Sequence, residues 1–243
     1  MSSNPTLLDA GGMASENREI VSTAMSWAVL RFMIVAYVLL SIGNYVTLGW
    51  TYVVFDGAIN RGVYPSVEQA DVLDLSVMIT AFGQIFVYVL SIIAYAVFFY
   101  KSQKNALEME RAPRELNAHG VYLWFAVPLA SWFMPLKRVG EIWATGRGWL
   151  DRPADFPAVG WLWWACWVFG GLLSAVERQL PSSSLDFVPS ADTFEQYQLG
   201  TGFFFVTQTL FVISAIGLLF VARGIARDQA EIRMALEATQ VLE

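Results

Sequence analysis

Four long stretches of the chain are almost wholly apolar, and polar segments separate them. They cover residues 27–50, 75–100, 158–176 and 201–221. An α-helix needs about 20 apolar residues to cross a hydrocarbon core of roughly 30 Å, and each stretch is close to that length or longer. The pattern therefore predicts an all-α fold, a polytopic transmembrane helical bundle with four full spans.

A fifth apolar segment, residues 121–136, is shorter and contains Pro128 and Pro135. A proline inside a helix removes a backbone hydrogen bond and kinks the helix. Such a broken backbone is tolerated at membrane depth only where protein or water covers it. We therefore expect a proline-broken segment, re-entrant or interfacial, that packs against other helices, although its length alone also leaves a full crossing open.

The fifteen Lys and Arg residues distinguish these two topologies, because short loops rich in cations stay in the cytoplasm. If residues 121–136 turn back, twelve cations lie on one side, Arg61 and Arg178 lie on the other, and Arg31 lies within the first span. If the segment crosses, the division is six against eight. The charge distribution favours four crossings, so we predict a multi-pass protein with both termini in the cytoplasm.

The segment after Pro135 has the spacing of an amphipathic helix. Leu136, Val139, Ile142 and Trp143 fall on one helical face, whereas Lys137, Arg138 and Glu141 fall on the other. Such a helix suits the membrane interface, where each Lys or Arg adds about 1 kcal/mol of attraction to an anionic surface. Lys137 and Arg138 are therefore candidate contacts for anionic lipid headgroups, and residues 145–157 are expected to form a turn-rich loop.

The polar segments divide the chain into three parts. Residues 1–23 form a polar N-terminal segment, residues 24–223 form the transmembrane helical domain, and residues 224–243 form a C-terminal helix on the cytoplasmic side. In the loop before the second span, Ser66 and Gln69 have the spacing of a capping box, which predicts the start of a helix there.

Composition supports a membrane protein and argues against several functions. The chain is 56% hydrophobic and 15% charged, with a mean hydropathy of +0.48, whereas soluble domains typically carry about 25% charged residues. A net charge of −6 gives a nucleic-acid partner no global electrostatic support. One cysteine, Cys166, and one histidine, His119, cannot form a disulfide or a typical zinc site. Without a phosphate-binding glycine loop or a catalytic serine elbow, we expect no cofactor and no enzymatic activity.

Three amide side chains lie inside the predicted spans, at Asn44, Gln84 and Gln208. They could line a path for a solute, but hydrogen bonds between helices, worth about 0.6 kcal/mol each, are their commoner use. The third span also has small residues at four-residue spacing, in one stripe of Cys166, Gly170 and Ser174 and another of Gly171 and Ala175. Both stripes predict close helix packing.

The region around the two prolines is similar to a known family. The aromatic-rich run from Phe125 to Pro135 is followed by Glu141-Ile142-Trp143, and Asn105 lies upstream in an Asn-Ala-Leu sequence after the second span. With the tryptophan-rich third span and the stretch 223–229, these features resemble the bacterial membrane family catalogued as domain of unknown function 4328. Members usually place Asn between the prolines, where this chain has Ser131. The resemblance covers roughly residues 98–229 and implies the four-span topology in a bacterial inner membrane, but no reaction.

The candidate functional or structural motif is therefore Pro128, Ser131, Pro135, Glu141 and Trp143. The favoured hypothesis is a non-enzymatic integral membrane protein with a structural or partner-binding role. Its expected partners are the lipid bilayer, anionic lipid headgroups and a second membrane protein or a further copy of the chain. The alternative is a small-solute channel or transporter whose pathway is lined by residues 128–135. A weaker third hypothesis is a lipid-modifying enzyme that uses Glu141 and Arg138.

Overall fold

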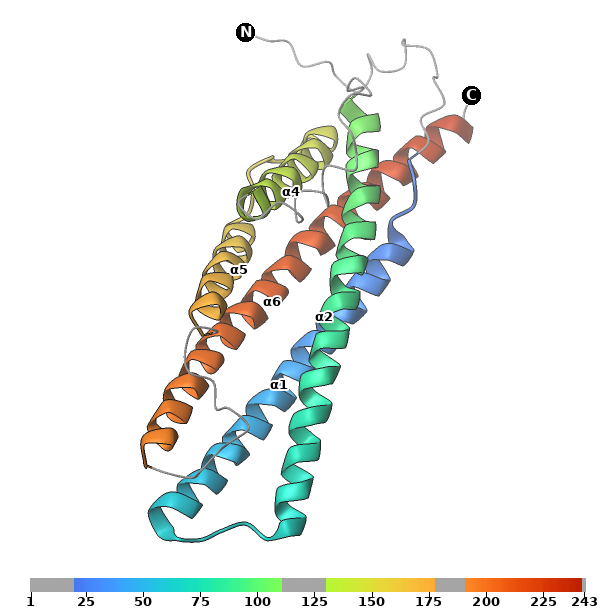
Figure 1. Cartoon of the computed structure of the whole chain (residues 1–243). Helices are drawn as coiled ribbons and strands as arrows, with labels where there is room; N and C mark the ends of the chain where they lie inside the picture. Colours follow the sequence, from blue (N-terminus) through green and yellow to red (C-terminus); the bar gives the residue numbers. More distant parts are fainter. Residues whose placement is uncertain (1–19, 111–129, 178–190, 242–243) are drawn as a thin grey trace.

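The computed structural model describes residues 20–110, 130–177 and 191–241, and all regular structure among them is helical (Figure 1). The helices are α1 (Ala24–Arg61), α2 (Val67–Glu110), α4 (Ala130–Trp149), α5 (Ala158–Glu177) and α6 (Ala191–Val241). Four of them, α1, α2, α5 and α6, are long and apolar enough to cross a membrane. The predicted all-α bundle with four spans is therefore confirmed.

Three of the spanning helices are much longer than the apolar stretches that predicted them. Helix α1 has 38 residues, α2 has 44 and α6 has 51, whereas about 20 residues are enough for the hydrocarbon core. An apolar stretch needs to be only as long as the membrane core is thick, but its polar flanks can continue the helix beyond it. Helix α1, for example, ends at the C-cap residue Gly62, which has a left-handed φ of 66°. The C-terminal helix expected at residues 224–243 is accordingly continuous with the last span in α6.

The start of α2 carries the capping box that the sequence indicates. The Ser66 backbone N–H donates to Gln69 Oε1 at 3.1 Å, and the Gln69 backbone N–H donates to Ser66 Oγ at 3.2 Å. The two bonds satisfy backbone donors that the first turn of a helix leaves without partners.

The helices are arranged side by side in the order α2, α1, α6, α5, and chain neighbours run antiparallel (Figure 1). Helix α1 packs against α2 on one side and α6 on the other, and α5 lies along α6. Helix α4 lies across one end of this row and contacts α2, α5 and α6. The end of α2, the start of α5 and the end of α6 all lie at this same end, which we call the α4 end.

Only the last part of the fifth apolar segment is described, and it forms about the first two turns of α4. Pro135 lies inside this helix, whereas Pro128 falls outside the described residues. Helix α4 continues to Trp149, so the expectation of a loop from residue 145 is wrong for its first five residues. The reason is a tertiary contact, since Arg147 in the last turn pairs with Asp228 of α6 and such packing stabilises helix ends that local sequence would not.

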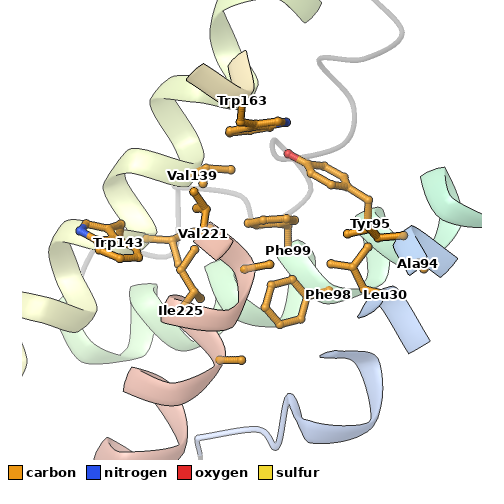
Figure 2. Packing of buried hydrophobic residues seen from close by; sticks show 14 of the residues in the cluster. Leu30, Ala94, Tyr95, Phe98, Phe99, Val139, Trp143, Trp163, Val221 and Ile225 are labelled. Carbon is orange, nitrogen blue, oxygen red and sulfur yellow. The ribbon is translucent and has the colours of Figure 1, made fainter. Parts of the chain in front are cut away.

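A single aromatic-rich core holds the α4 end together (Figure 2). Phe98 and Phe99 of α2 are fully buried and meet edge to face with ring centroids 5.0 Å apart. Leu30 of α1, Val139 of α4 and Val221 of α6 are also at 0% exposure in this cluster. The predicted apolar face of α4 is thus confirmed as a face, and it packs against α2 and α6.

The seam between α5 and α6 brings two backbones into contact. A Cβ on Gly217 of α6 would lie 2.9 Å from the Trp163 Cβ and 3.2 Å from the Val159 carbonyl oxygen of α5. A Cβ on Gly170 would meet the Phe211 ring at 3.0 Å, and Cys166 is buried, which confirms packing along the first predicted stripe. The second stripe is wrong, because Gly171 and Ala175 are exposed and nothing lies within 4 Å of a Cβ on Gly171.

Candidate functional site

A layer of neutral polar side chains crosses the bundle within the spans. We call Ser41, Asn44, Gln84 and Gln208 the amide layer; they come from α1, α2 and α6. Asn44 Nδ2 donates to Gln84 Oε1, Gln84 Nε2 donates to Ser41 Oγ at 3.3 Å, and Gln208 Nε2 donates to Ser41 Oγ at 2.7 Å. Ser41 Oγ in turn donates to the Tyr37 carbonyl oxygen at 2.8 Å. The three amides therefore form hydrogen bonds between helices, as the sequence predicts.

This network is what a buried polar group requires in a membrane. Ser41 is fully buried, and Asn44 and Gln208 are 7% and 5% exposed. A polar group without a partner costs several kcal/mol in hydrocarbon, so these side chains must bond to one another. The solute-path hypothesis needs the same side chains around a common hydrated cavity, whereas each of them faces a helix–helix contact.

A second polar contact, which we call the asparagine clamp, lies at the α4 end. Asn105 Oδ1 accepts from the Val21 backbone N–H at 2.9 Å, and Asn105 Nδ2 donates to the Val21 carbonyl oxygen at 2.9 Å. Asn105 Nδ2 also donates to Gln229 Oε1 at 3.1 Å, and Gln229 Nε2 donates to the Ser102 carbonyl oxygen at 3.0 Å. The clamp ties the non-helical residues before α1 to both α2 and α6. This arrangement gives a physical role to Asn105, which the sequence resemblance singles out.

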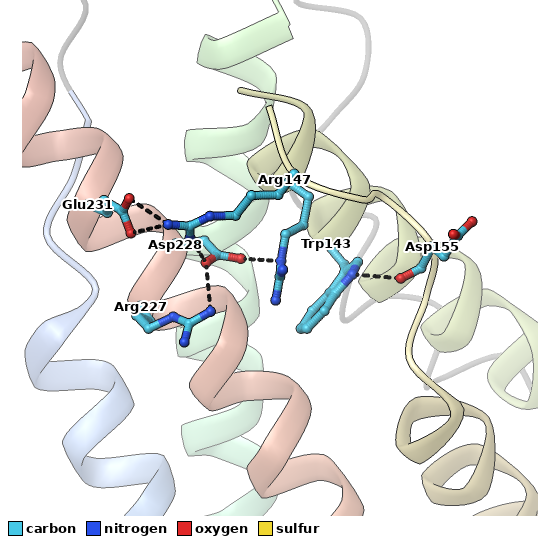
Figure 3. Close-up of polar contacts among 7 residues, drawn as sticks. Trp143, Arg147, Asp155, Arg227, Asp228 and Glu231 are labelled. Carbon is cyan, nitrogen blue, oxygen red and sulfur yellow. Dashed lines mark hydrogen bonds and ion pairs between the residues drawn. The ribbon is translucent and has the colours of Figure 1, made fainter. Parts of the chain in front are cut away.

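The third polar group is an ionic cluster of Arg147, Arg152, Arg227, Asp228 and Glu231 (Figure 3). Asp228 of α6 has a side chain only 3% exposed, and its two oxygens meet Arg147 Nε at 2.7 Å and Arg152 Nη1 at 3.0 Å. Arg152 Nη2 also meets Glu231 Oε1 at 2.7 Å. Arg227 Nη2 lies at 3.6 Å from Asp228, the longest of these contacts. The cluster fastens the end of α4 and the residues after it to α6.

The charges of this cluster depend on one another, so together they hold the end of α4 against α6 more firmly than independent ion pairs would. A buried carboxylate is costly unless cations and hydrogen bonds compensate it, and Asp228 has two close guanidinium groups. The hydrogen bond to Glu231 raises the pKa of Arg152 above its ordinary value, with a smaller contribution from the charge of Asp228. Arg152 therefore keeps its charge at any physiological pH.

Trp143 of the predicted motif lies directly beside the ionic cluster. Its ring centroid is 4.5 Å from Arg147 Cζ, a cation–π distance. Its indole Nε1 donates to the Asp155 carbonyl oxygen at 3.1 Å (Figure 3). On its other side Trp143 packs on Gly224 of α6, where any Cβ would overlap the ring. Trp143 thus positions Arg147 and holds α4 close to α6.

Among the residues that the structure describes, the other predicted ones are not brought together around one centre. Glu141 pairs with Arg138 within α4 at 2.8 Å, and Lys137 is exposed. Pro135 is fully buried, Pro128 lies outside the described residues, and so does the side chain of Ser131. Among the described residues, no group of three or more His, Cys, Asp or Glu could hold a metal ion.

Sequence reasoning missed Asp228, Arg152 and Glu231. Asp228 is an acidic residue between cations in the last helix, and it lies in the stretch 223–229 that contributes to the family resemblance. Neither signal indicates its partners. Its two close partners, Arg147 and Arg152, are far away in the chain, 76 residues in the case of Arg152, so no spacing rule connects them to Asp228.

A comparison with known proteins matches part of the chain to a family model. A family model described as "Domain of unknown function (DUF4328)" matches residues 61–227, from the end of α1 to the residue before Asp228. The match contains α2, α4 and α5 and most of α6. No curated protein and no solved structure matches the chain.

Proposed function

The chain belongs to the family described as domain of unknown function (DUF4328), and from this premise we propose that it is a non-enzymatic membrane protein that binds a second membrane-spanning helix along α2. Four apolar helices make it an integral membrane protein. The partner-binding role rests on the unequal burial of these four helices.

Helix α2 is far less covered than the other spans. Only 6% of its most apolar window is buried, against 28% for α1 and α6 and 22% for α5. Large side chains stand on its open side at spacings of three and four residues: Phe82, Ile85, Phe86, Val89 and Ile93. Such a ridge fits the groove of a neighbouring helix. In lipid, association depends on this packing, because burial from water supplies no driving force there.

The orientation is part of the proposal. We place the α4 end in the cytoplasm of a bacterial cell and the protein in its inner membrane. Arg61 is the one described Lys or Arg in the half that contains the α1–α2 turn, and the other described cations lie in the half that contains α4. This distribution supports a cytoplasmic α4 end. Lys137, exposed on α4, is then available to anionic headgroups.

The proposal is tested with two variants. The double variant F82A/F86A alters α2, and the single variant F169A alters α5. Phe82 and Phe86 on α2 are 68% and 65% exposed, and Phe169 on α5 is 60% exposed. The full chain is extracted from its native membrane in a mild detergent and its mass is measured by light scattering. We expect a complex with a second membrane protein or a second copy, reduced in F82A/F86A and retained in F169A.

A monomer in the unaltered protein, or equal loss in both variants, contradicts partner binding along α2. The small-solute pathway is less well supported, because it would have to break the amide layer to free Asn44, Gln84 and Gln208 for a solute. The absence of enzymatic activity remains part of the proposal and rests on the sequence.

A further inference from the structure

One face of α6 is exposed along nearly its whole length. Every third or fourth residue on this face is open: Gly202, Val206, Thr209, Ile213, Ile216, Phe220, Arg223, Arg227, Ala230 and Met234. The 3–4 spacing means that these residues form one continuous stripe. Most of the stripe lies away from the residues that pack on α1 and α5 and faces the surroundings of the bundle. Thr209 also contacts α1, because its hydroxyl lies 2.8 Å from the Tyr45 hydroxyl.

The stripe changes from apolar to cationic at one point. Ile213, Ile216 and Phe220 are apolar and exposed, and the next two members are Arg223 and Arg227. From Ile213 to Arg223 the helix rises by about 15 Å, which is half of a hydrocarbon core of roughly 30 Å. The apolar part therefore has the length of one leaflet, and the two guanidinium groups lie at its outer boundary.

Both arginines are available for an external anion. No carboxylate of the described residues lies within salt-bridge distance of Arg223. Arg227 has a side chain 65% exposed, and its contact with Asp228 is long at 3.6 Å. Asp228 already has Arg147 and Arg152 at 2.7 and 3.0 Å, so it does not need Arg227 for compensation. The residues at 223 and 227 are one helical turn apart, which lets two guanidinium groups approach one phosphate.

We propose that this stripe is a binding site for one anionic phospholipid, with its phosphate on Arg223 and Arg227 and an acyl chain along Phe220, Ile216 and Ile213. The headgroup is recognised by charge and by the planar donors of the guanidinium groups. The acyl chain contributes dispersion contacts rather than specificity. The site lies on a different helix from the proposed partner face of α2 and does not depend on it.

The test uses the full chain, stripped of lipid in detergent and titrated with a phosphatidylglycerol or a phosphatidylcholine while bound lipid is counted by native mass spectrometry. We expect phosphatidylglycerol to bind more tightly. R223Q should weaken it by about fivefold and R223Q/R227Q by about thirtyfold, since each cation contributes about 1 kcal/mol. The matched control is R61Q, which removes an exposed arginine at the opposite end and should leave the affinity unchanged.

Thermal unfolding of each variant checks that the fold is intact. If the double variant is unstable, R223Q alone still tests the site, because it removes no described ion pair. Equal affinity for the two lipids overturns the site. The site is also overturned if R223Q binds phosphatidylglycerol with unchanged affinity, or if R61Q loses as much affinity as R223Q. Displacement of phosphatidylglycerol by equimolar inorganic phosphate would overturn it as well. Loss of the α2 complex in F82A/F86A with lipid binding intact would separate this site from the proposed partner surface.

Discussion

The amide layer and the ionic cluster are two ways of holding helices together with buried polar groups. The amide layer uses only neutral side chains, and the ionic cluster uses four charges around Asp228. Gln208 and Asp228 lie about 20 residues apart on α6, about 30 Å along the helix, which is roughly the thickness of the hydrocarbon core. Depth explains the difference, because an ion within the hydrocarbon is far more costly than an amide with a partner.

The two regions also hold different parts of the molecule. The amide layer joins α1, α2 and α6, all of which span. The ionic cluster joins α4 and the residues after it to α6. Substitutions that remove charge should therefore release α4 and leave the spanning helices paired, and substitutions in the amide layer should do the reverse.

The largest effect is expected for Asp228→Asn. The substitution keeps the shape but leaves Arg147 without a compensating carboxylate and Arg152 with Glu231 alone. Breaking a buried ion pair costs about 3 kcal/mol or more. Thermal unfolding in detergent measures the loss. The matched control is Glu237→Gln on the same helix, whose pair with Arg233 is exposed on both sides and should change stability by less than about 0.5 kcal/mol. Equal effects in the two variants would mean that burial does not strengthen the ionic cluster.

Gly224→Ala is expected to come next, at about 2 kcal/mol, which is typical of overpacking. The added Cβ overlaps the Trp143 ring and pushes α4 away from α6. Gly171→Ala is the control, since a Cβ there has nothing within 4 Å. Unfolding temperature and the near-ultraviolet circular dichroism of the tryptophans report the result. A neutral Gly224→Ala would contradict the close contact between α4 and α6.

Gln208→Met should cost less, about 0.6 kcal/mol, because it removes one hydrogen bond to Ser41 while keeping the volume. The expected loss is in the pairing of α1 with α6, and α4 should stay docked. Steric-trap or detergent-unfolding measurements resolve a difference of this size. If Gln208→Met lowered the free energy of unfolding as much as Asp228→Asn does, the amide layer and the ionic cluster would not differ in strength.

Added salt should give the smallest effect. Raising the ionic strength from 0.1 to 1 M shortens the Debye length from about 10 to about 3 Å, which weakens the partly exposed contacts of Arg152. We expect a decrease of a few tenths of a kcal/mol in the unaltered protein. The decrease should be smaller in Asp228→Asn, where the pair of Arg152 with Glu231 is the part of these contacts that remains. A decrease of equal size in both proteins would mean that Asp228 contributes nothing to the salt dependence.

The sequence was informative where one local property decides the structure. Each span has its own apolar length, and the capping box of Ser66 and Gln69 needs only three residues. The use of Asn44, Gln84 and Gln208 also followed from their place within spans. The length of α4 and the role of Asp228 did not follow, because both depend on contacts between residues far apart in the chain. The predicted stripe of Gly171 and Ala175 failed because small residues tolerate close packing without requiring it.

Impermeant maleimide labelling of single cysteines, in a Cys166→Ser background, tests the four-crossing arrangement most directly. Lys104→Cys and Lys137→Cys replace exposed cations on the two sides of the residues that link α2 to α4, and Val63→Cys marks the α1–α2 turn. In sealed vesicles of known orientation, we expect the first two cysteines to react from the same side, the cytoplasmic one, and Val63→Cys to react only from the other. Reaction of Lys104→Cys and Lys137→Cys from opposite sides would contradict the arrangement of the whole C-terminal half.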